Sequence, residues 1–412
     1  MYLASVERPA EAVAGRTKRI AGNVLALGAV SLVTDVSSEM VSAVLPLYLV
    51  VGLGLGPVVY GLVDGLYTGA TALLRLVGGY VADRVRRRKL VAGLGYGISA
   101  VAKFGLLAAG TWVPGIGAAI VADRAGKGLR TAPRDALITL SAPAGSLGRA
   151  FGVHRAMDTT GAFAGPLVAL AVLAASGQAF DAVFVTSGCV AAIGVLVLVL
   201  FVRDQRGPES AAKAVDLRAA TALLRLAPVR SLLLGAVLLG LSTIGDGFVY
   251  LLLQRRENLA VGWFPLLAVG TSLVYLLLAV PLGTLADRIG RPPIFLGGYA
   301  ALLAVYLLLA TSWGGLPALL SVLFLYGVFY AATDGVLMAL AGPLLPPELR
   351  TTGLALIQTG QALAYLVSSV LFGLAWHWWD APGATRAAAA AAALTLAASA
   401  TFLLRPRPGG AA

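Results

Sequence analysis

The sequence predicts an all-α protein that crosses a membrane many times, with two similar halves of six helices each. The composition is the first observation: 59% of the 412 residues are hydrophobic and 12% are charged, whereas soluble proteins carry about 25% charged residues. The second is a series of apolar segments, each about 18 residues or longer and able to span a bilayer as a helix. The third is an element near residue 80 that returns 204 residues later, about half the chain length.

The apolar segments divide the chain into twelve predicted spans. When the N-terminus is placed in the cytoplasm, 21 Lys and Arg residues fall on the inner side and 3 on the outer side. This is the positive-inside pattern, so we expect a multi-pass protein of the cell membrane with both termini in the cytoplasm. The predicted spans are 20–50, 57–79, 90–110, 114–140, 150–173, 181–202, 229–253, 263–283, 294–312, 315–342, 352–376 and 384–404.

The longest polar connection follows the sixth span. It predicts an N-terminal six-helix bundle over 1–202, a cytoplasmic linker over 203–228 and a C-terminal six-helix bundle over 229–412. Within the linker, residues 219–226 could form a short surface helix. Two halves that share an element are the usual architecture of a secondary transporter.

Several functional classes are excluded. The net charge of +12 lies in the loops of one side, so its natural partner is the inner leaflet and not a nucleic acid. The single cysteine, Cys189, cannot form a disulfide within the chain. No arrangement of nucleophile and base, metal-ligand spacing or nucleotide-binding loop is present. We therefore expect no enzymatic activity, no metal and no cofactor.

The fourth span contains an unusual number of charges. A charged side chain at the bilayer centre costs about 2.5–3.5 kcal/mol on insertion scales. On a helix these side chains fall within an arc of about 140°, so we expect the arc to face water or countercharges inside the bundle. The charged residues are Asp123, Arg124, Lys127, Arg130, Arg134 and Asp135.

Two carboxylates of the first span suggest proton coupling. Asp35 and Glu39 are one helical turn apart, and in a low dielectric their repulsion favours a proton on one of them. Pairing with Arg124 would release that proton. We predict that Asp35 and Glu39 carry the proton and that Arg124 couples to them. The alternative is a static ion-pair network that only joins the first and fourth spans.

Acids of the second half, together with bases of the fourth span, are predicted to contact a solute. Asp246 with Tyr250, and Asp334 with Tyr330, each share one helix face at i,i+4 spacing. These pairs could bind a cationic or hydroxylated solute, or only bond to neighbouring helices. The predicted solute contacts are Lys127, Arg130, Asp246, Asp334 and Tyr330.

The repeated element carries a family resemblance. Gly79-Tyr-Val-Ala-Asp83-Arg84 and Gly283-Thr-Leu-Ala-Asp287-Arg288 resemble the loop signature of the major facilitator superfamily. The first copy has Arg86 where the signature usually has a second glycine. The resemblance implies twelve helices in two pseudo-symmetric bundles, with spans 1, 4, 7 and 10 lining a central cavity.

The same signature indicates a gate on the inner side. A carboxylate such as Asp83 can cap the N-terminus of a neighbouring helix, and basic residues after it can pair with Asp135 at the inner end of the fourth span. The alternative is an ordinary positively charged loop. The predicted gate residues are Asp83, Arg84, Asp135, Asp287 and Arg288.

Further segments resemble the same superfamily. Arg124-Ala-Gly-Lys127-Gly128 is similar to its Arg-x-x-Gln-Gly element, with Lys replacing Gln. Gly161-Ala-Phe-Ala-Gly165-Pro166 resembles an element of proton-driven antiporters, although the following glycine pair is absent; ordinary close helix contact is the alternative. The stretch from Thr34 to Met40 resembles a bacterial and archaeal branch that is similar to drug and metabolite antiporters.

These patterns together predict a secondary active transporter that works by alternating access. The leading hypothesis is proton-coupled efflux, by antiport, of a small organic solute or drug. One alternative is a carrier of an organic or phosphorylated anion bound by the basic face of the fourth span. Another is a transport-inactive receptor on the same fold. The expected partners are the lipid bilayer, a small-molecule solute and protons, and we expect a functional monomer that binds no nucleic acid.

Overall fold

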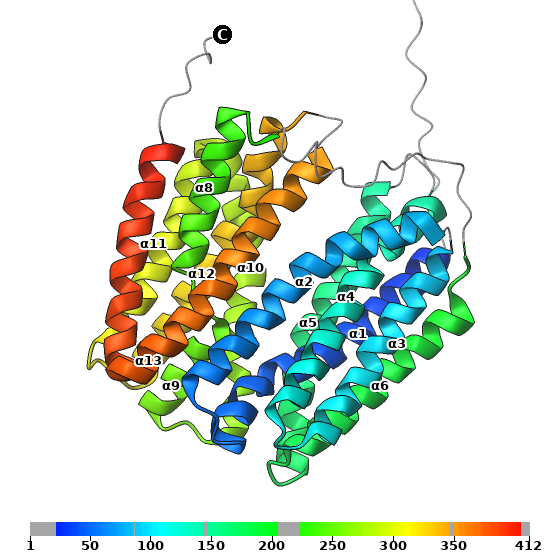
Figure 1. The fold of residues 1–412 in the computed structure, drawn as a ribbon, viewed down its shortest axis with the longest axis horizontal. Helices are drawn as coiled ribbons and strands as arrows, with labels where there is room; N and C mark the ends of the chain where they lie inside the picture. Colours follow the sequence, from blue (N-terminus) through cyan, green and yellow to red (C-terminus); the bar gives the residue numbers. More distant parts are fainter. Residues whose placement is uncertain (1–21, 86, 143–146, 205–222, 347–349, 405–412) are drawn as a thin grey trace, which may run out of the picture.

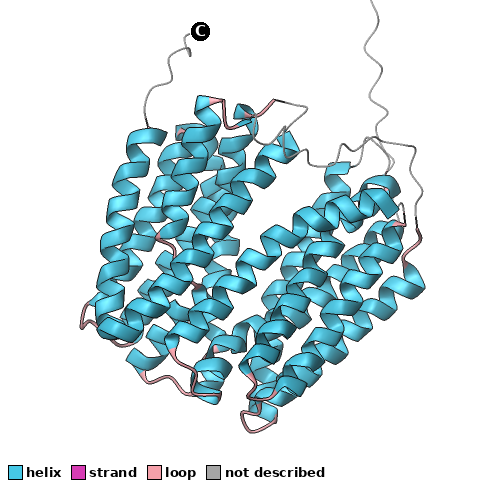
Figure 2. Cartoon of the chain, in the orientation of Figure 1, coloured by secondary structure: helices cyan, strands magenta, loops and turns pink. Residues whose placement is uncertain are grey.

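The structure, a computed structural model, describes residues 22–85, 87–142, 147–204, 223–346 and 350–404. It describes their side chains except those of 72–73, 75–85, 147–148 and 350–352. All regular secondary structure in these ranges is helical (Figure 2). Nine helical segments of the described residues are long and apolar enough to cross a membrane. The prediction of an all-α polytopic membrane protein is therefore confirmed, and the number of twelve spans stays a prediction.

The helices follow the predicted spans in chain order (Figure 1). Their bounds are α1 (Gly22–Leu47), α2 (Pro57–Val85), α3 (Arg88–Ala109), α4 (Val113–Ser141), α5 (Leu147–Ala175), α6 (Phe180–Phe201), α8 (Ala227–Leu241), α9 (Asp246–Glu257), α10 (Pro265–Ile289), α11 (Arg291–Ala310), α12 (Leu316–Ala341) and α13 (Arg350–Leu403). Three short turns complete them: η1 (Tyr48–Gly52), η3 (Val261–Trp263) and η4 (Gly342–Leu344). Residues 219–222, half of the predicted surface helix at 219–226, lie outside the described residues.

The seventh predicted span, 229–253, corresponds to one apolar segment, Ala227–Glu257, that is long enough to cross a membrane. Its helix is interrupted between α8 and α9. The hydroxyls of Ser242 and Thr243 each donate to the Leu239 carbonyl at 2.9 Å, a bond that competes with the helical backbone. The Tyr306 hydroxyl stabilises the break: it donates to the Ser242 carbonyl at 3.1 Å and accepts from the Ile244 N–H at 2.9 Å. The second half-helix therefore begins at Asp246.

A second break divides α13 into the two helices that the sequence predicts there. Asp380 adopts a left-handed conformation with φ of 64°. Its carboxylate accepts the Gly383 N–H at 2.8 Å, which caps the start of the following helix. Pro382 fits within that first turn, where a missing N–H costs nothing.

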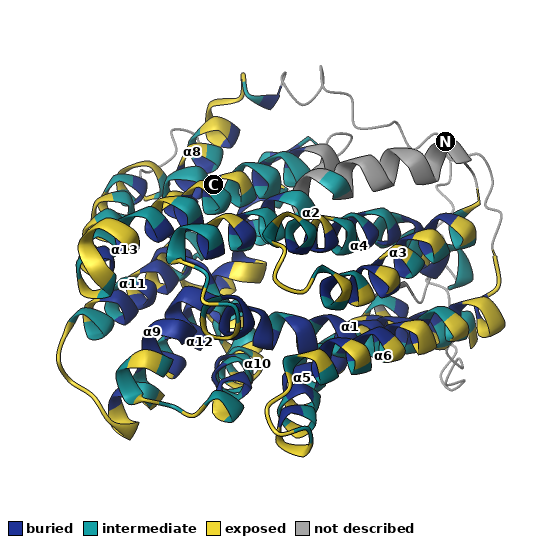
Figure 3. Ribbon diagram, turned by 60° about the horizontal axis from the view of Figure 1, so that its bottom comes forward, coloured by how far each residue is buried: buried dark blue, intermediate teal, exposed yellow. Residues whose placement is uncertain are grey.

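The helices form two groups. Helices α1 to α6 contact one another, as do α8 to α13, and the groups meet mainly through α2 against α13 and α5 against α10. We propose that these groups are the two predicted domains. Exposed leucine, valine and phenylalanine side chains lie on outer helices such as α3 and α6 (Figure 3), where a bilayer would surround them.

The two groups touch closely at the end of the molecule that lies opposite the chain termini. Along the first half of α2, glycines allow the backbone of α13 to approach: a Cβ added at Gly65 would lie 2.9 Å from the Leu366 carbonyl oxygen. Gly61 and Gly373 make similarly close contacts with the opposite group. Toward the termini the two groups diverge (Figure 1). The structure is therefore closed at the far end.

A bulky side chain at Gly65 should open this closed end. We expect Gly65→Leu to separate α2 from α13, because 2.9 Å leaves no space for a side chain. In a Cys189→Ala background, a cysteine introduced at Leu45, which lines the central cavity, should react several-fold faster with a charged thiol reagent added at the far end.

The matched control is Gly97→Leu, since nothing lies within 4 Å of a Cβ added there. Equal labelling rates in the Gly65→Leu and Gly97→Leu variants would contradict the assignment of α2 and α13 as the closed contact.

Candidate functional site

A central cavity of about 230 Å³ lies between the two helix groups. Its walls come from α1, α2 and α5 on one side and from α9, α10 and α13 on the other. A second cavity of about 350 Å³ adjoins it and shares Thr68, Asp246 and Tyr365. The two cavities place residues from both halves of the chain around one space, as a transport site requires.

One group of charges on α4 is neutralised behind this cavity. Asp123 accepts hydrogen bonds from Lys103 Nζ at 2.9 Å and Ser99 Oγ at 2.8 Å, and it forms an ion pair with Arg124. The Arg124 guanidinium also lies over the Tyr67 ring, 3.9 Å from its centroid. In this structure the ion pair of Arg124 is with its neighbour Asp123, and its predicted coupling to Asp35 and Glu39 stays a prediction.

Arg130 takes the place beside Asp35 that the sequence analysis gave to Arg124. Its Nη2 lies 3.8 Å from Asp35 Oδ1, and its guanidinium stacks over the Tyr96 ring at 4.4 Å. Arg130 is only 3% exposed and lines neither central cavity. In this structure Arg130 is thus part of the ion-pair network between the helices, and its predicted contact with a solute stays a prediction.

Arg134 joins three helices. Its Nη1 donates to Ser31 Oγ on α1 at 3.1 Å and lies 3.8 Å from Asp158 on α5. Its other nitrogens bind the adjacent Asp135, with Nη2 to Oδ1 at 3.0 Å. Asp135 is thus paired with Arg134 on its own helix.

Two carboxyl groups face each other in the same network. Asp35 on α1 and Asp158 on α5 interact with each other. A hydrogen bond between two carboxyl groups would need a proton on one of them, because an ionised carboxylate only accepts. Lys127 acts electrostatically on Asp35, Glu39 and Asp158. Among the described residues Lys127 has no ion pair within 4.0 Å, and it lines neither central cavity.

The glycine and proline element on α5 brings this helix against α1. A Cβ added at Gly161 would lie 2.9 Å from the Leu32 Cα, and one at Gly165 would lie 2.8 Å from the Val36 carbonyl oxygen and 2.6 Å from the Glu39 Cβ. Pro166 lines the central cavity. The small residues therefore allow α5 to seat Asp158 near Asp35 and leave space for Glu39.

Asp64 on α2 binds across the two groups. Its carboxylate accepts the Ser369 hydroxyl of α13 and lies 3.4 Å from the Tyr60 hydroxyl. It also lies against the break between α8 and α9: a Cβ added at Gly245 would be 2.6 Å from the Asp64 Cγ. The Asp64 carboxylate fits here only because residue 245 is a glycine and has no side chain.

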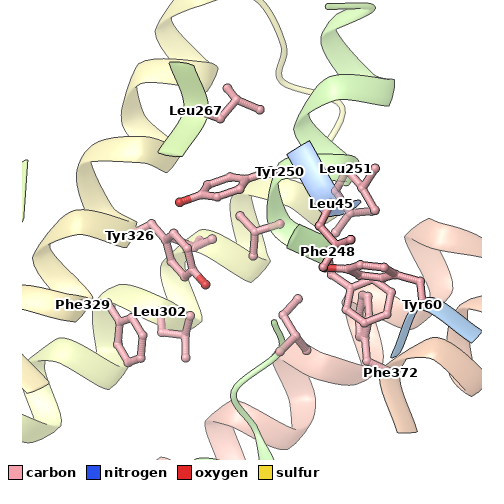
Figure 4. Packing of buried hydrophobic residues seen from close by; sticks show 14 of the residues in the cluster. Leu45, Tyr60, Phe248, Tyr250, Leu251, Leu267, Leu302, Tyr326, Phe329 and Phe372 are labelled. Atoms are coloured by element: carbon pink, nitrogen blue, oxygen red, sulfur yellow. The ribbon is translucent and has the colours of Figure 1, made fainter. Parts of the chain in front are cut away.

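Asp246, at the first position of α9, is held by tyrosines of α12. Its Oδ1 accepts the Tyr326 hydroxyl at 2.7 Å and the Tyr330 hydroxyl. Tyr250, one turn further along α9, meets Tyr326 edge to face with ring centroids 6.2 Å apart (Figure 4). Tyr330, which the sequence analysis paired with Asp334, thus binds Asp246, and Asp246 lines both central cavities.

Asp334 lines the second cavity, one turn beyond Tyr330 on α12. It is exposed to that space, and Asp334 Oδ2 accepts the Tyr275 hydroxyl at 3.1 Å. Tyr326, Tyr330 and Asp334 follow one another at four-residue spacing, so they lie along one face of the helix. This face runs from Asp246 toward the end that carries the termini.

The predicted gate residues are described only in part. Asp287 binds Arg291 at 3.1 Å, and Arg291 Nη1 donates to the Ala339 carbonyl at 2.7 Å. Gly290, with φ of 103°, makes the turn between α10 and α11. It stands at the position of the second signature glycine, which the first copy replaces with Arg86. Arg288 is exposed. The side chains of Asp83 and Arg84 lie outside the described residues, so their roles stay predictions.

Sequence reasoning had assigned no role to several residues of this site. Asp64, Lys103 and Asp158 were recognisable as charged residues inside predicted spans. Because charge in a membrane is costly, their presence there indicates a functional or pairing role. Their partners were not recognisable, because Asp64 and Ser369 are 305 residues apart in the chain. Tyr326 could have been found from its four-residue spacing to Tyr330.

The buried network around Asp123 should be essential for stability. We expect Asp123→Asn to cost about 3–5 kcal/mol, because it leaves two buried cations without a countercharge. Lys103→Met should cost less, since Asp123 keeps Arg124 as its partner. The thermal unfolding midpoint of the purified protein in detergent measures both effects.

The exposed Arg230 at the start of α8 supplies the control variant, Arg230→Gln, which should leave the midpoint unchanged. The assigned network is incorrect if Asp123→Asn unfolds at the same temperature as this control.

Three solved transporters share the fold with low sequence identity. A nucleoside transporter, NupG, superposes with a TM-score of 0.78 at 15% identity and covers 93% of this chain and 99% of its own. A POT family transporter in complex with 5-aminolevulinic acid gives 0.76 at 13% identity, covering 95% and 97%. A bacterial homologue of the human lysosomal transporter Spinster, inward-facing and unoccupied, gives 0.69 at 16%, covering 95% and 96%.

The sequence comparisons assign the family. An uncharacterised MFS-type transporter of Methanocaldococcus jannaschii is 32% identical over 371 residues, which are 87% of this chain and 89% of the relative. An uncharacterised protein of Mycobacterium tuberculosis is 37% identical over 158 residues, 38% of each chain. The model of the Major Facilitator Superfamily matches residues 27–266 and 256–412. The chain belongs to the major facilitator superfamily and has the fold of its secondary transporters.

Proposed function

We propose that this protein is a proton-coupled antiporter that exports a small organic solute. The observation that carries the proposal is the pair of interacting carboxyl groups, Asp35 and Asp158, each 3.8 Å from a guanidinium group. A proton on one carboxyl would let the two form a hydrogen bond. Glu39, one turn from Asp35, lines the central cavity. A proton-binding pair and a solute cavity are thus adjacent on one helix.

The cations around this pair provide the alternative to the proton. Arg130 lies 3.8 Å from Asp35, Arg134 lies 3.8 Å from Asp158, and Lys127 acts on both carboxyls. When the shared proton leaves, these cations compensate the new negative charge. A carboxyl group that alternates between a proton and a cationic partner is the physical basis of proton relays in pumps and transporters.

The shape of the two groups supports alternating access. The molecule is closed where α2 meets α13 and diverges toward the termini. With both termini in the cytoplasm, as the loop charges predict, this is the state that receives solute from the cytoplasm. The export direction rests on the Gly161–Pro166 element, which resembles that of proton-driven antiporters, and on the close contact that it makes with α1.

Flux from vesicles tests the coupling. Purified protein is reconstituted into vesicles loaded with radiolabelled phenyltrimethylammonium or benzenesulfonate, and the membrane potential is clamped with potassium and valinomycin. We expect external acidification to accelerate loss of one of the two solutes about fivefold or more, because protons entering through an antiporter drive solute out. Asp35→Asn combined with Glu39→Gln should remove this acceleration.

Asp181→Asn, at the exposed start of α6, removes a carboxylate far from the network and should retain the acceleration. Flux that ignores the pH gradient, or full gradient dependence in the Asp35→Asn and Glu39→Gln double variant, would rule out the coupling role of these residues.

A further inference from the structure

We propose that the transported solute is a small organic cation with an aromatic or alkyl body, and that Asp246 is its main anionic contact. This inference rests on the proposed function of the same site and adds the chemical class of the solute. It follows from the charges, the free acceptor atoms and the aromatic walls of the two central cavities, which are taken in turn below.

The described lining of both cavities is acidic. Glu39, Asp64 and Asp246 line the first cavity, and Asp246 and Asp334 line the second, whereas neither lining contains a lysine or arginine. Among the described residues, none of these four carboxyls forms an ion pair; those on α4 and α5 do. A buried carboxyl group without a countercharge is stabilised by a proton or by a cation that enters from outside.

The anion-carrier alternative needs bases in the cavity lining, and no base of α4 is found there. Lys127 has no ion pair among the described residues, but it lines neither central cavity. Arg124 is paired with Asp123, Arg130 with Asp35, and Arg134 with Asp135. None of the three lines a central cavity. An anion entering the cavities would meet uncompensated carboxyls and no cationic side chain of the described lining, so the charge of the site selects against it.

The tyrosines orient Asp246 toward a ligand. Both Tyr326 and Tyr330 bind the same oxygen, Oδ1. The described side chains donate no hydrogen bond to Oδ2, so this oxygen can accept a bond or an ion contact from the solute. The break before α9 brings Asp246 between the two helix groups, where α2 is close enough for Asp64 to contact Gly245.

The walls suit an organic cation better than a metal ion. Six tyrosines line the two cavities, and the face of an aromatic ring attracts a cation while tolerating apolar groups. A strongly hydrated metal ion instead needs several oxygen ligands, and the described residues contain no group of three His, Cys, Asp or Glu that could hold one. The tyrosines are Tyr60, Tyr67, Tyr250, Tyr299, Tyr330 and Tyr365.

Asp334 gives the cation a first contact on its way inward. It lies on the same face of α12 as Tyr330, exposed to the second cavity and nearer to the diverging end of the molecule. A cation that enters there meets Asp334 first and Asp246 next. Asp334 should therefore contribute less to final binding than Asp246.

Binding to the purified protein tests the solute class without requiring transport. Isothermal titration with phenyltrimethylammonium and with tetraphenylphosphonium should show saturable binding of at least one cation, while benzenesulfonate should not bind. We expect Asp246→Asn to weaken binding of the cation at least tenfold, because asparagine keeps an oxygen acceptor for the tyrosines but removes the charge. Asp334→Asn should weaken binding several-fold, and Asp181→Asn should not change it.

Three outcomes of the binding experiment overturn the inference. Absence of binding by both cations, tighter binding of benzenesulfonate, or unchanged affinity in Asp246→Asn would do so; if Asp246→Asn fails to fold, unchanged affinity in Asp334→Asn decides the question. Cation binding combined with gradient-insensitive flux would keep the solute class and reject the proton coupling. Gradient-driven flux of benzenesulfonate without cation binding would keep the proton coupling and reject the solute class.

Discussion

The cost of charge in an apolar helix bundle governs this structure. Five of the six charged residues on α4 form ion pairs, some within the helix and some with neighbouring helices. Lys103 from α3 meets Asp123, while Asp35 from α1 and Asp158 from α5 meet Arg130 and Arg134. Removing one member of such a network costs far more than the pairs contribute net. The charges therefore fix the rotation of α4 and its depth against three helices, and this placement keeps its bases away from the central space.

A second constraint, the break between α8 and α9, places the acids of the other half. A continuous helix would carry Asp246 as one polar residue on an apolar segment. The break instead starts a new half-helix at Asp246, with the Tyr306 hydroxyl satisfying the backbone groups on either side. Half-helices that begin inside the membrane are typical of transporter binding sites. The resulting site differs from the α4 network in that its carboxyls are bound by hydroxyl groups and not by bases.

From the sequence we could predict features that depend on local periodicity and on the free-energy cost of charge in a membrane. Features that depend on the rotation of one helix against another could not be predicted. The approximate span limits, the division of α13 near Asp380 and the shared helix face of Tyr330 and Asp334 follow from hydropathy and spacing within a segment. The partner of Arg124 does not. Asp123, Asp35 and Glu39 were all available by type, and about 100° of rotation per residue decides which of them a guanidinium reaches. Ser242, Thr243 and Gly245 are residue types that favour a break in a helix before α9. The Tyr306 hydroxyl that stabilises this break belongs to another helix.

The two charge arrangements explain how a proton and a cationic solute would exclude each other. Glu39 belongs to both: Lys127 and Arg124 act on it from the α4 side, and it faces the central cavity from α1. In a low dielectric, a cation arriving beside Glu39 raises the cost of every other positive charge nearby. The guanidinium groups of this network remain protonated in proteins, so the proton that we propose to lie between Asp35 and Asp158 is the positive charge that we expect to leave. Exchange of the proton for the cationic solute would thus need no large conformational change between the halves. Electrostatic repulsion across one turn of α1, between Asp35 and Glu39, would suffice.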